Sequence, residues 1–341
     1  MSGLLHSTWR KALRRYHGGP LVVGLVNNMP DAALRSTERQ FRELLADAAG
    51  RRAVRLRVFS LPGLARSQAG RDYIRDNHED IERLWDAELD GLIVTGTEPR
   101  AADLTAEPFW PALTRLVDWA AEHTAATVWS CLAAHAAVHY LDGIARQARN
   151  AKLSGVYDCI QAADHALLGR GPARWRTPHS RCNELPESAL LAHGYQILSR
   201  ADGAGVDIFA KRERSLFLFL QGHPEYDAGA LLREYRRDVG RFLAGERDSY
   251  PDMPYGYFDD TVAQAMLAFR ERALRVRDAV LLADFPTAAT QHTPHAPWHG
   301  AARRLFANWL SYLADARSRE RGWGTSLPSR RAVPKAALTY G

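Results

Sequence analysis

The stretch TVWSCLAAHAAVHYLDGI, residues 127–144, decides how the fold is interpreted. An apolar run with β-branched and aromatic side chains ends at Cys131, and small residues follow it. A strand that ends in a nucleophile and turns tightly into a helix has this pattern, because the turn and the close helix packing both favour small side chains. A buried strand and helix whose cysteine only fills space has the same pattern. The stretch therefore predicts a strand, a turn and a helix, and leaves the role of Cys131 open.

The composition is that of an ordinary globular protein. The chain has 341 residues, of which 46% are hydrophobic and 25% are charged, so it can bury a full core. Its cysteines are odd in number and form no CxxC pair, which argues against a disulfide framework and against a structural zinc site. They are Cys131, Cys159 and Cys182. We expect a reducing cytoplasm as the location and no metal site.

The net charge of +6 does not indicate a nucleic-acid partner. Residues 317–335 hold six basic residues and one acid, which leaves +1 for the rest of the chain. We therefore predict a flexible basic tail over residues 317–341. Residues 124–141 carry no formal charge, but their histidines, serine, threonines and alanines favour a buried strand and helix over a membrane span. Residues 1–20 lack the features of a signal peptide and are expected to form an N-terminal extension.

Predicted strands and helices alternate along the chain. Apolar runs predict strands at residues 21–26, 54–61, 91–97 and 126–130, and a hairpin at 206–211 and 216–221. Helical patterns cover residues 32–48, 108–123, the segment after Cys131, 228–244 and 301–316. This order predicts an α/β fold with a mainly parallel sheet flanked by helices. Sites in such sheets gather at the carboxyl ends of the strands.

Three candidate site residues follow predicted strands directly: Gly96, Cys131 and His223. A cysteine at a helix N-terminus is stabilised as the thiolate by the helix dipole, and the amide of Leu132 is placed to donate to an oxyanion. Glu225 lies two residues after His223, so in extended backbone both side chains project to one side. These residues predict a nucleophile, a base and an orienting acid. A buried inert cysteine and a surface turn at HPE remain the alternatives.

The order of several motifs resembles one family. The motifs are NNMPD, TG after the third strand, cysteine before AAHAA, KLSGVYD, PHSR, GHPEYD with REYRRD, and FANWLSYL. Together they resemble the homoserine O-acyltransferases of methionine biosynthesis, the type with a class I glutamine amidotransferase-like fold. The resemblance runs from about Val22 to Leu313, and implies a flavodoxin-like, three-layer catalytic domain over residues 21–316.

The resemblance implies a role for each matching residue. Cys131 is then the acyl-accepting nucleophile, His223 the general base and Glu225 the orienting carboxylate, and Leu132 and Gly96 bound the oxyanion site. Substrate contacts are implied at Lys152, Ser180 and Arg237. The implied reaction uses acyl-CoA as co-substrate, with no cofactor and no metal. A histidine pair at helical spacing, His135 and His139, lacks a third ligand and is expected to pack. A homodimer is expected by the same resemblance.

Several positions depart from the family pattern. His135 replaces a glutamine, Cys182 a tyrosine and Gly256 an asparagine, and residues 261–297 form an atypical insertion that is expected to be a lid, a dimer contact or a surface helix. The run AQAMLAFRERALRVRDAVLLA within it predicts a helix. Arg100 stands where the family has glycine or glutamate, and an arginine facing the acyl pocket favours the carboxylate of a succinyl group over acetyl. A side chain that points to solvent is the alternative, and it would leave the donor open.

Other functions remain open from the sequence. L-Serine differs from homoserine by one methylene, a difference that a pocket discriminates by only about 1–3 kcal/mol. A glutamine amidotransferase-like hydrolase uses the same three residue types, but KLSGVYD and PHSR argue against it. A non-catalytic binding protein is less expected, because the cysteine, histidine and glutamate are all present.

Overall fold

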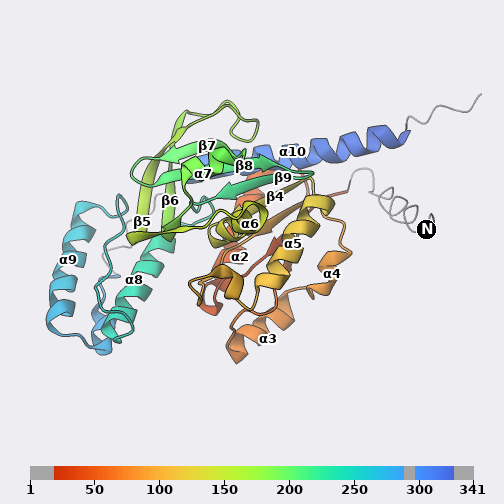
Figure 1. Cartoon of the computed structure of the whole chain (residues 1–341). Coiled ribbons are helices and arrows are strands. Elements are labelled where there is room, and N and C mark those ends of the chain that lie inside the picture. The colour runs from red at the N-terminus through yellow and green to blue at the C-terminus, as the bar shows by residue number, and fades with distance from the viewer. Residues whose placement is uncertain (1–18, 288–295, 326–341) are drawn as a thin grey trace, which may run out of the picture.

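The computed structural model describes residues 19–287 and 296–325 (Figure 1). Most of the predicted N-terminal extension, residues 1–18, lies outside this part of the chain, as do residues 288–295 of the predicted insertion and 326–341 of the predicted tail.

Nine strands form one sheet within the described residues, in the order β2-β1-β3-β4-β9-β8-β7-β5-β6. The first five of this order are β2 (Val54–Phe59), β1 (Leu21–Val26), β3 (Gly91–Val94), β4 (Ala126–Ser130) and β9 (Leu216–Leu220). They pair in parallel throughout. Their sequences are short apolar runs because both faces of the sheet are covered, as in other parallel sheets. This half of the sheet confirms the predicted α/β fold class.

The other half of the sheet is antiparallel. It consists of β8 (Gly205–Arg212), β7 (Gln196–Ala201), β5 (Gln147–Gln161) and β6 (Arg174–Glu184). The predicted hairpin of β8 and β9 is confirmed, whereas β5, β6 and β7 were not predicted. The long strands β5 and β6 are largely polar and only partly buried, so their sequences lack the apolar runs or regular alternation that identify a strand.

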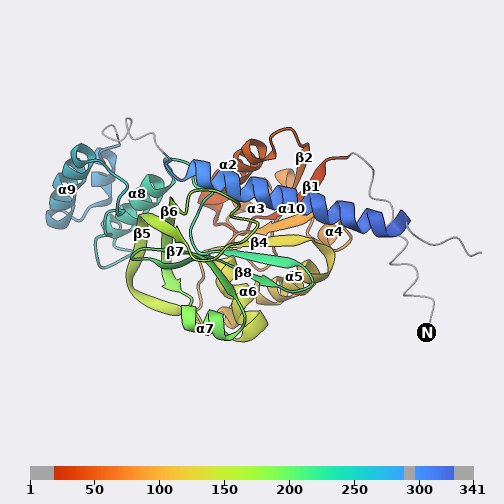
Figure 2. The same ribbon diagram turned by 90° about the horizontal axis from the view of Figure 1, so that it is seen from above.

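Helices cover both faces of the sheet, which confirms the predicted three layers (Figure 2). On one face, α2 (Asp31–Ala49) and α10 (His299–Thr325) bury aromatic and aliphatic side chains against β1, β4 and β9. On the other face, α5 (Trp110–His123) and α6 (Leu132–Asp142) cover the same strands. Outside the predicted insertion, the other helices of the described residues are α3 (Gln68–Asn77), α4 (Glu82–Trp85), η2 (Leu104–Ala106), α7 (Glu187–Ala192) and α8 (Ala230–Leu243).

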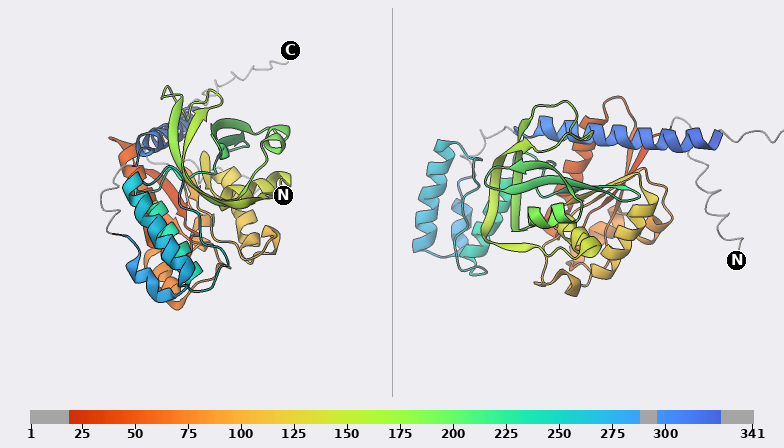
Figure 3. Two further views of the ribbon diagram at one scale, coloured as in Figure 1. Left: turned by 90° about the vertical axis from the view of Figure 1, so that its left-hand side faces the viewer. Right: turned by 45° about the horizontal axis from the view of Figure 1, so that its top comes forward.

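The predicted insertion packs against α8 at one end of the molecule (Figure 3). Its helix α9 (Asp260–Arg275) buries Val262, Met266 and Phe269 against Tyr235 and Phe242 of α8. The predicted helical run is wrong beyond residue 275. Residue 276 has extended backbone, and the Asp278 side chain then caps a separate 3-10 helix, η3 (Ala279–Asp284).

The first part of the predicted tail, residues 317–341, belongs to helix α10. Helix α10 continues to Thr325, so residues 317–325 are helical. Arg317 also ties this helix to the start of the described chain, because its guanidinium donates to the carbonyls of Pro20 and Gly19 at 3.0 and 3.1 Å. Among the residues the structure describes, no helix is long and apolar enough to cross a membrane.

Helix α10 is expected to be a main source of stability. Phe306 is 1% exposed and its ring lies 6.3 Å from that of Phe41 on α2. Phe306→Ala should lower the free energy of unfolding by about 3–5 kcal/mol, because it removes buried apolar contacts and leaves a cavity. Arg303→Ala, at an exposed site on the same helix, should change it by less than about 0.5 kcal/mol. Equal urea-unfolding midpoints for the two variants would contradict this role.

Candidate active site

Cys131 occupies a strained turn between a buried strand and a helix. All residues of β4 are buried, and α6 begins at Leu132. Cys131 has φ 52° and ψ −116°, and it is the only non-glycine residue with positive φ in the described part of the chain. Such a conformation costs a residue with a side chain about 1–3 kcal/mol and is typical of functional sites. The backbone of this turn therefore resembles a nucleophile elbow.

The pairing of β4 with β9 brings His223 beside Cys131. Ser130 pairs with Leu220, and the Cys131 amide donates to the Leu220 carbonyl at 2.7 Å. His223 follows three residues later and is 5% exposed. Its Nδ1 lies 2.9 Å from Oε1 of Glu225, which leaves Nε2 for the thiol of Cys131, a side chain that interacts with the imidazole. The structure thus brings together the three residues assigned to catalysis from the sequence.

The charges around His223 favour its protonated form. Burial acts to lower the pKa of His223, but the charges of Glu225 and Cys131 outweigh it and raise that pKa well above the usual 6.5. A raised histidine pKa stabilises the fold below the usual pKa, and this contribution is lost as the pH rises through the raised value. A protonated His223 beside Cys131 is the arrangement that favours the thiolate, the reactive form of a cysteine nucleophile.

The two positions assigned to the oxyanion site adjoin each other. Leu132 is the first residue of α6, so its amide has no acceptor within the helix. Gly96 lies against this amide so closely that a Cβ on it would come within 2.8 Å of the Leu132 nitrogen. A side chain at position 96 would therefore obstruct the space beside the Leu132 amide.

Three of the four residues assigned to substrate binding, all but Arg100, converge on two acidic side chains of α8. The Lys152 ammonium lies 2.7 Å from Asp238 and 3.5 Å from Glu234. The hydroxyl of Ser180 donates to Glu234, and the Arg237 guanidinium donates twice to Asp238 at 3.0 Å. Cations on β5 and α8 and a hydroxyl on β6 are thus held in one cluster.

A tyrosine joins this cluster to the catalytic histidine. The ring of Tyr226 stacks on His223 with 4.2 Å between centroids, and its hydroxyl donates to Glu234 at 2.5 Å. Burial acts to raise the pKa of Glu234, but the Lys152 charge and the hydrogen bonds from Ser180 and Tyr226 keep it below its usual value. Glu234 is therefore an ionised, partly buried carboxylate.

The sequence interpretation missed Glu234, Asp238 and Tyr226. Spacing could have identified the two acids, because Glu234 and Asp238 stand at i, i+4 and therefore share one helix face. All three residues lie in motifs that were read for other members, Tyr226 in GHPEYD and the two acids in REYRRD.

Arg100 lies outside the cluster on α8. It is exposed, and its side chain lines a hollow with Pro30, Arg66 and Arg71. Within the described residues no contact joins its guanidinium to Lys152 or Arg237. The hollow is a separate feature of the same sheet edge.

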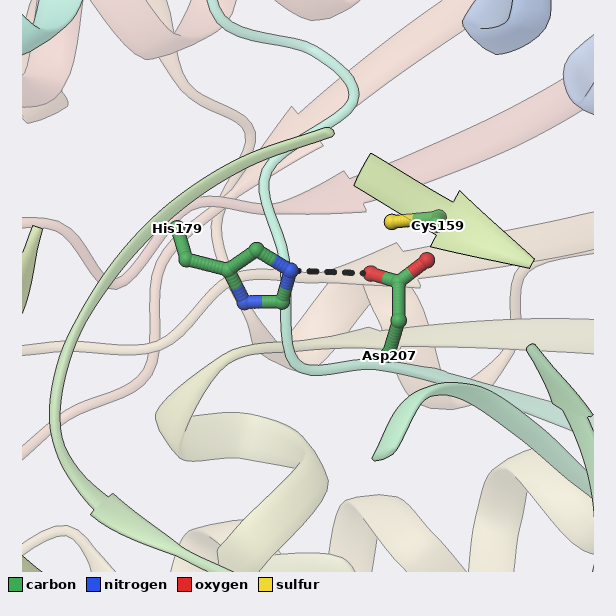
Figure 4. A group of neighbouring side chains, drawn as sticks. All are labelled: Cys159, His179 and Asp207. Atoms are coloured by element: carbon green, nitrogen blue, oxygen red, sulfur yellow. Dashed lines mark ion pairs between the residues drawn. The ribbon is translucent and has the colours of Figure 1, made fainter. Parts of the chain in front are cut away.

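A buried cluster behind the histidine offers three possible metal ligands, Cys159, His179 and Asp207 (Figure 4). Their ligand atoms lie within 4.8 Å of one another, and Nε2 of His179 is 3.3 Å from Oδ1 of Asp207. In the described part of the chain no fourth histidine, cysteine or carboxylate joins them, whereas a structural zinc site has four ligands. Burial lowers the pKa of His179, so this contact pairs a neutral imidazole with a carboxylate inside the core.

This buried pair supports the turn that carries His223. A Cβ on Gly222 would lie 2.7 Å from Oδ1 of Asp207 and 3.0 Å from Nε2 of His179, so the turn rests directly on the pair. The His223 amide donates to the Pro178 carbonyl at 2.7 Å. The position of the catalytic imidazole is therefore fixed from below as well as by Glu225.

The strain at Cys131 gives a stability test. Cys131→Gly should be more stable than Cys131→Ala by roughly 1 kcal/mol, because glycine adopts this backbone freely and the relief exceeds its larger chain entropy. Equilibrium unfolding in urea measures the difference. An alanine variant as stable as the glycine variant would show that the turn is not strained.

The charge of Glu225 should control the reactivity of Cys131. Glu225→Gln removes the charge that raises the pKa of His223, so the imidazolium should be lost at lower pH. Alkylation of Cys131 by iodoacetamide at pH 7 should then slow several-fold, with peptide mass spectrometry separating Cys131 from the exposed Cys182. Glu122→Gln, at an exposed site, is the matched control. An unchanged rate of Cys131 alkylation in Glu225→Gln would contradict the coupling.

Comparison with solved structures agrees with the observed fold. The chain resembles the crystal structure of a Thermoplasma acidophilum protein described as a putative GMP synthase subunit, with a TM-score of 0.50. The match covers 89% of this chain and 100% of that one at 14% sequence identity, so it concerns the fold alone.

Sequence comparison reaches further. A family model described as Homoserine O-succinyltransferase matches residues 9–319. A protein of Rhodopseudomonas palustris named homoserine O-succinyltransferase is 51% identical over 86% of this chain and 89% of its own length. One of the same name from Methylorubrum extorquens is 48% identical over 86% of this chain and 88% of its own. The chain therefore belongs to the homoserine O-succinyltransferase family of acyltransferase enzymes.

Proposed function

We propose that this protein transfers a succinyl group from succinyl-CoA to the hydroxyl of L-homoserine, through an acyl-cysteine intermediate, in methionine biosynthesis. The observation that carries the proposal is the contact of Cys131 with a buried histidine whose other nitrogen is held by Glu225. The names of the relatives support both the succinyl group and the acceptor.

In the first step the Cys131 thiolate attacks the thioester carbonyl. The negative charge that develops on the carbonyl oxygen is stabilised by the Leu132 amide, at the positive end of the helix α6 dipole. The carbon–sulfur bond to CoA breaks, and the His223 imidazolium protonates the departing thiolate. The succinyl group is then joined to Cys131 as a new thioester.

In the second step His223 acts as the base. The imidazole, neutral after the first step, takes the proton of the homoserine hydroxyl as this oxygen attacks the acyl-cysteine. The thiolate of Cys131 leaves, and the imidazolium formed on His223 restores the starting pair. Glu225 holds the imidazole in one orientation through both transfers.

The acceptor site is supported by the cluster on α8. Arg237 is 41% exposed at its side chain and Lys152 is 24% exposed, so both can exchange an internal partner for a substrate carboxylate. A guanidinium binds a carboxylate through two parallel hydrogen bonds. The ionised Glu234 is linked to His223 through Tyr226. This link fixes the position of the cluster that binds the charged end of an amino acid relative to the base that acts on its hydroxyl end.

The names of the relatives support succinyl as the donor. Arg100 does not add to this support, because its side chain lines the separate hollow. The chemistry of both steps uses protein side chains and the co-substrate only. We further propose that the enzyme works as a cytoplasmic homodimer without a bound cofactor.

Release of free CoA thiol tests the function. Wild type and Cys131→Ala are assayed with succinyl-CoA or acetyl-CoA against L-homoserine or L-serine, and the product mass is recorded. Succinyl-CoA with L-homoserine should be preferred by at least about tenfold, and Cys131→Ala should lose at least about a thousandfold in kcat. A faster acetyl or serine reaction would correct the substrate. Hydrolysis of glutamine without CoA release would replace the proposal with an amidohydrolase.

A further inference from the structure

A second basic region opens at the same edge of the sheet as Cys131. The loops after β1, β2 and β3 and the start of α3 border an open hollow of about 980 Å³, a volume that includes space open to solvent. Three arginines line it: Arg66, Arg71 and Arg100. Because β1, β2, β3 and β4 run parallel, the loops that follow these strands lie at one edge of the sheet.

The hollow carries more positive charge than its own acids neutralise. Arg66 is 6% exposed at its side chain, and its Nη1 lies 3.2 Å from Oδ1 of Asp31, the one acid in the lining. Arg71 donates to the Arg66 carbonyl at 2.6 Å and to the amide oxygen of Gln68 at 2.8 Å, both neutral acceptors. The guanidinium of Arg100 has no hydrogen bond or ion pair in the described part of the chain.

Contacts within the protein fix Arg66 and Asp31 on one side of the hollow, and the charges of Arg71 and Arg100 are not neutralised there. Arg66 also donates to the Met29 carbonyl and lies 3.3 Å from the hydroxyl of Ser60, so it joins the loops after β1 and β2. Asp31 accepts from the Ser67 amide at 2.7 Å, which fixes the carboxylate on this side of the hollow. The positive charges of Arg71 and Arg100 are therefore available to bind an anion from solution. Guanidinium groups bind phosphate through bidentate, charge-assisted hydrogen bonds.

The position of the hollow suits the far end of a long donor. Strand β2 lies three places from β4 in the sheet, a lateral distance of about 14 Å for strands about 4.8 Å apart. In an acyl-CoA the thioester and the phosphates stand at opposite ends of the pantetheine arm. A donor with its thioester at Cys131 is therefore long enough to reach the loops of β1 and β2.

We propose that the Arg66, Arg71 and Arg100 hollow binds the phosphate groups of the acyl-CoA donor. The inference rests on the proposed function and gives Arg100 a different role from the one expected from sequence. Arg100 then contributes to the affinity for any CoA thioester, and does not select between succinyl and acetyl groups.

Donors with and without the nucleotide test the assignment. Arg71→Gln and Arg100→Gln are compared with Arg303→Gln, a control at an exposed site on α10. The donors are succinyl-CoA, acetyl-CoA and the S-succinyl thioester of N-acetylcysteamine, which lacks every phosphate. In the first two variants the ratio of kcat/KM for succinyl-CoA to that for the short thioester should fall roughly tenfold. The loss should fall on KM, it should be equal for acetyl-CoA, and the control should be unchanged.

Three results would overturn the proposal. They are an equal loss with the short thioester, a loss confined to succinyl donors, and unchanged kinetics in both variants. The second of these would restore a carboxylate partner for Arg100. Cys131-dependent turnover of succinyl-CoA by the wild type tests the proposed acyl transfer itself, so its absence would refute the function and not only the hollow. Competitive inhibition by adenosine 3′,5′-bisphosphate, weaker in the two variants, provides a measurement of nucleotide binding with a ligand that carries no acyl group.

Discussion

The site depends on the parallel pairing of β4 with β9. These strands lie far apart in the chain, yet Ser130 pairs with Leu220 and the Cys131 amide donates to the Leu220 carbonyl. Because the strands are parallel, both chains leave the sheet at the same edge, one into the cysteine turn and the other into the turn that carries His223. A slip of one residue in a strand reverses which face each side chain meets. The contact of thiol and imidazole is therefore a consequence of sheet register.

Two buried polar contacts hold that register on the β9 side. Nε2 of His135 on α6 lies 3.0 Å from Oε1 of Gln221, and burial together with the Arg181 charge lowers the pKa of this histidine to about 3. A neutral imidazole can donate to the amide oxygen without a buried charge. The contact of His179 on β6 with Asp207 on β8 supports Gly222. Buried polar groups that are paired fix one arrangement, because any other leaves them without partners.

The sequence predicted those parts of the site that depend on local pattern. Cys131 and His223 each follow a short apolar run, and Glu225 stands at the spacing that an orienting carboxylate needs. The strands β5 and β6, which carry Lys152 and Ser180, are polar and partly exposed, so no apolar periodicity marked them. Arg100 could not be located, because the direction of its side chain is set by how three loops pack. Residue types and spacing within one segment could be predicted from the sequence, whereas contacts between distant loops could not.

The cluster on α8 and the arginine-lined hollow differ in their balance of positive and negative charges, and the difference matches their proposed ligands. Around α8, the cations Lys152 and Arg237 face the acids Glu234 and Asp238. An amino acid carries one charge of each sign, so it can replace internal partners there and leave no buried charge unpaired. In the hollow, three guanidinium groups face the single carboxylate of Asp31. A region with such an excess attracts a polyanion and repels a free cation, and this attraction weakens with added salt. Under the proposed function, this difference in charge separates the site for a zwitterionic acceptor from the site for an anionic donor.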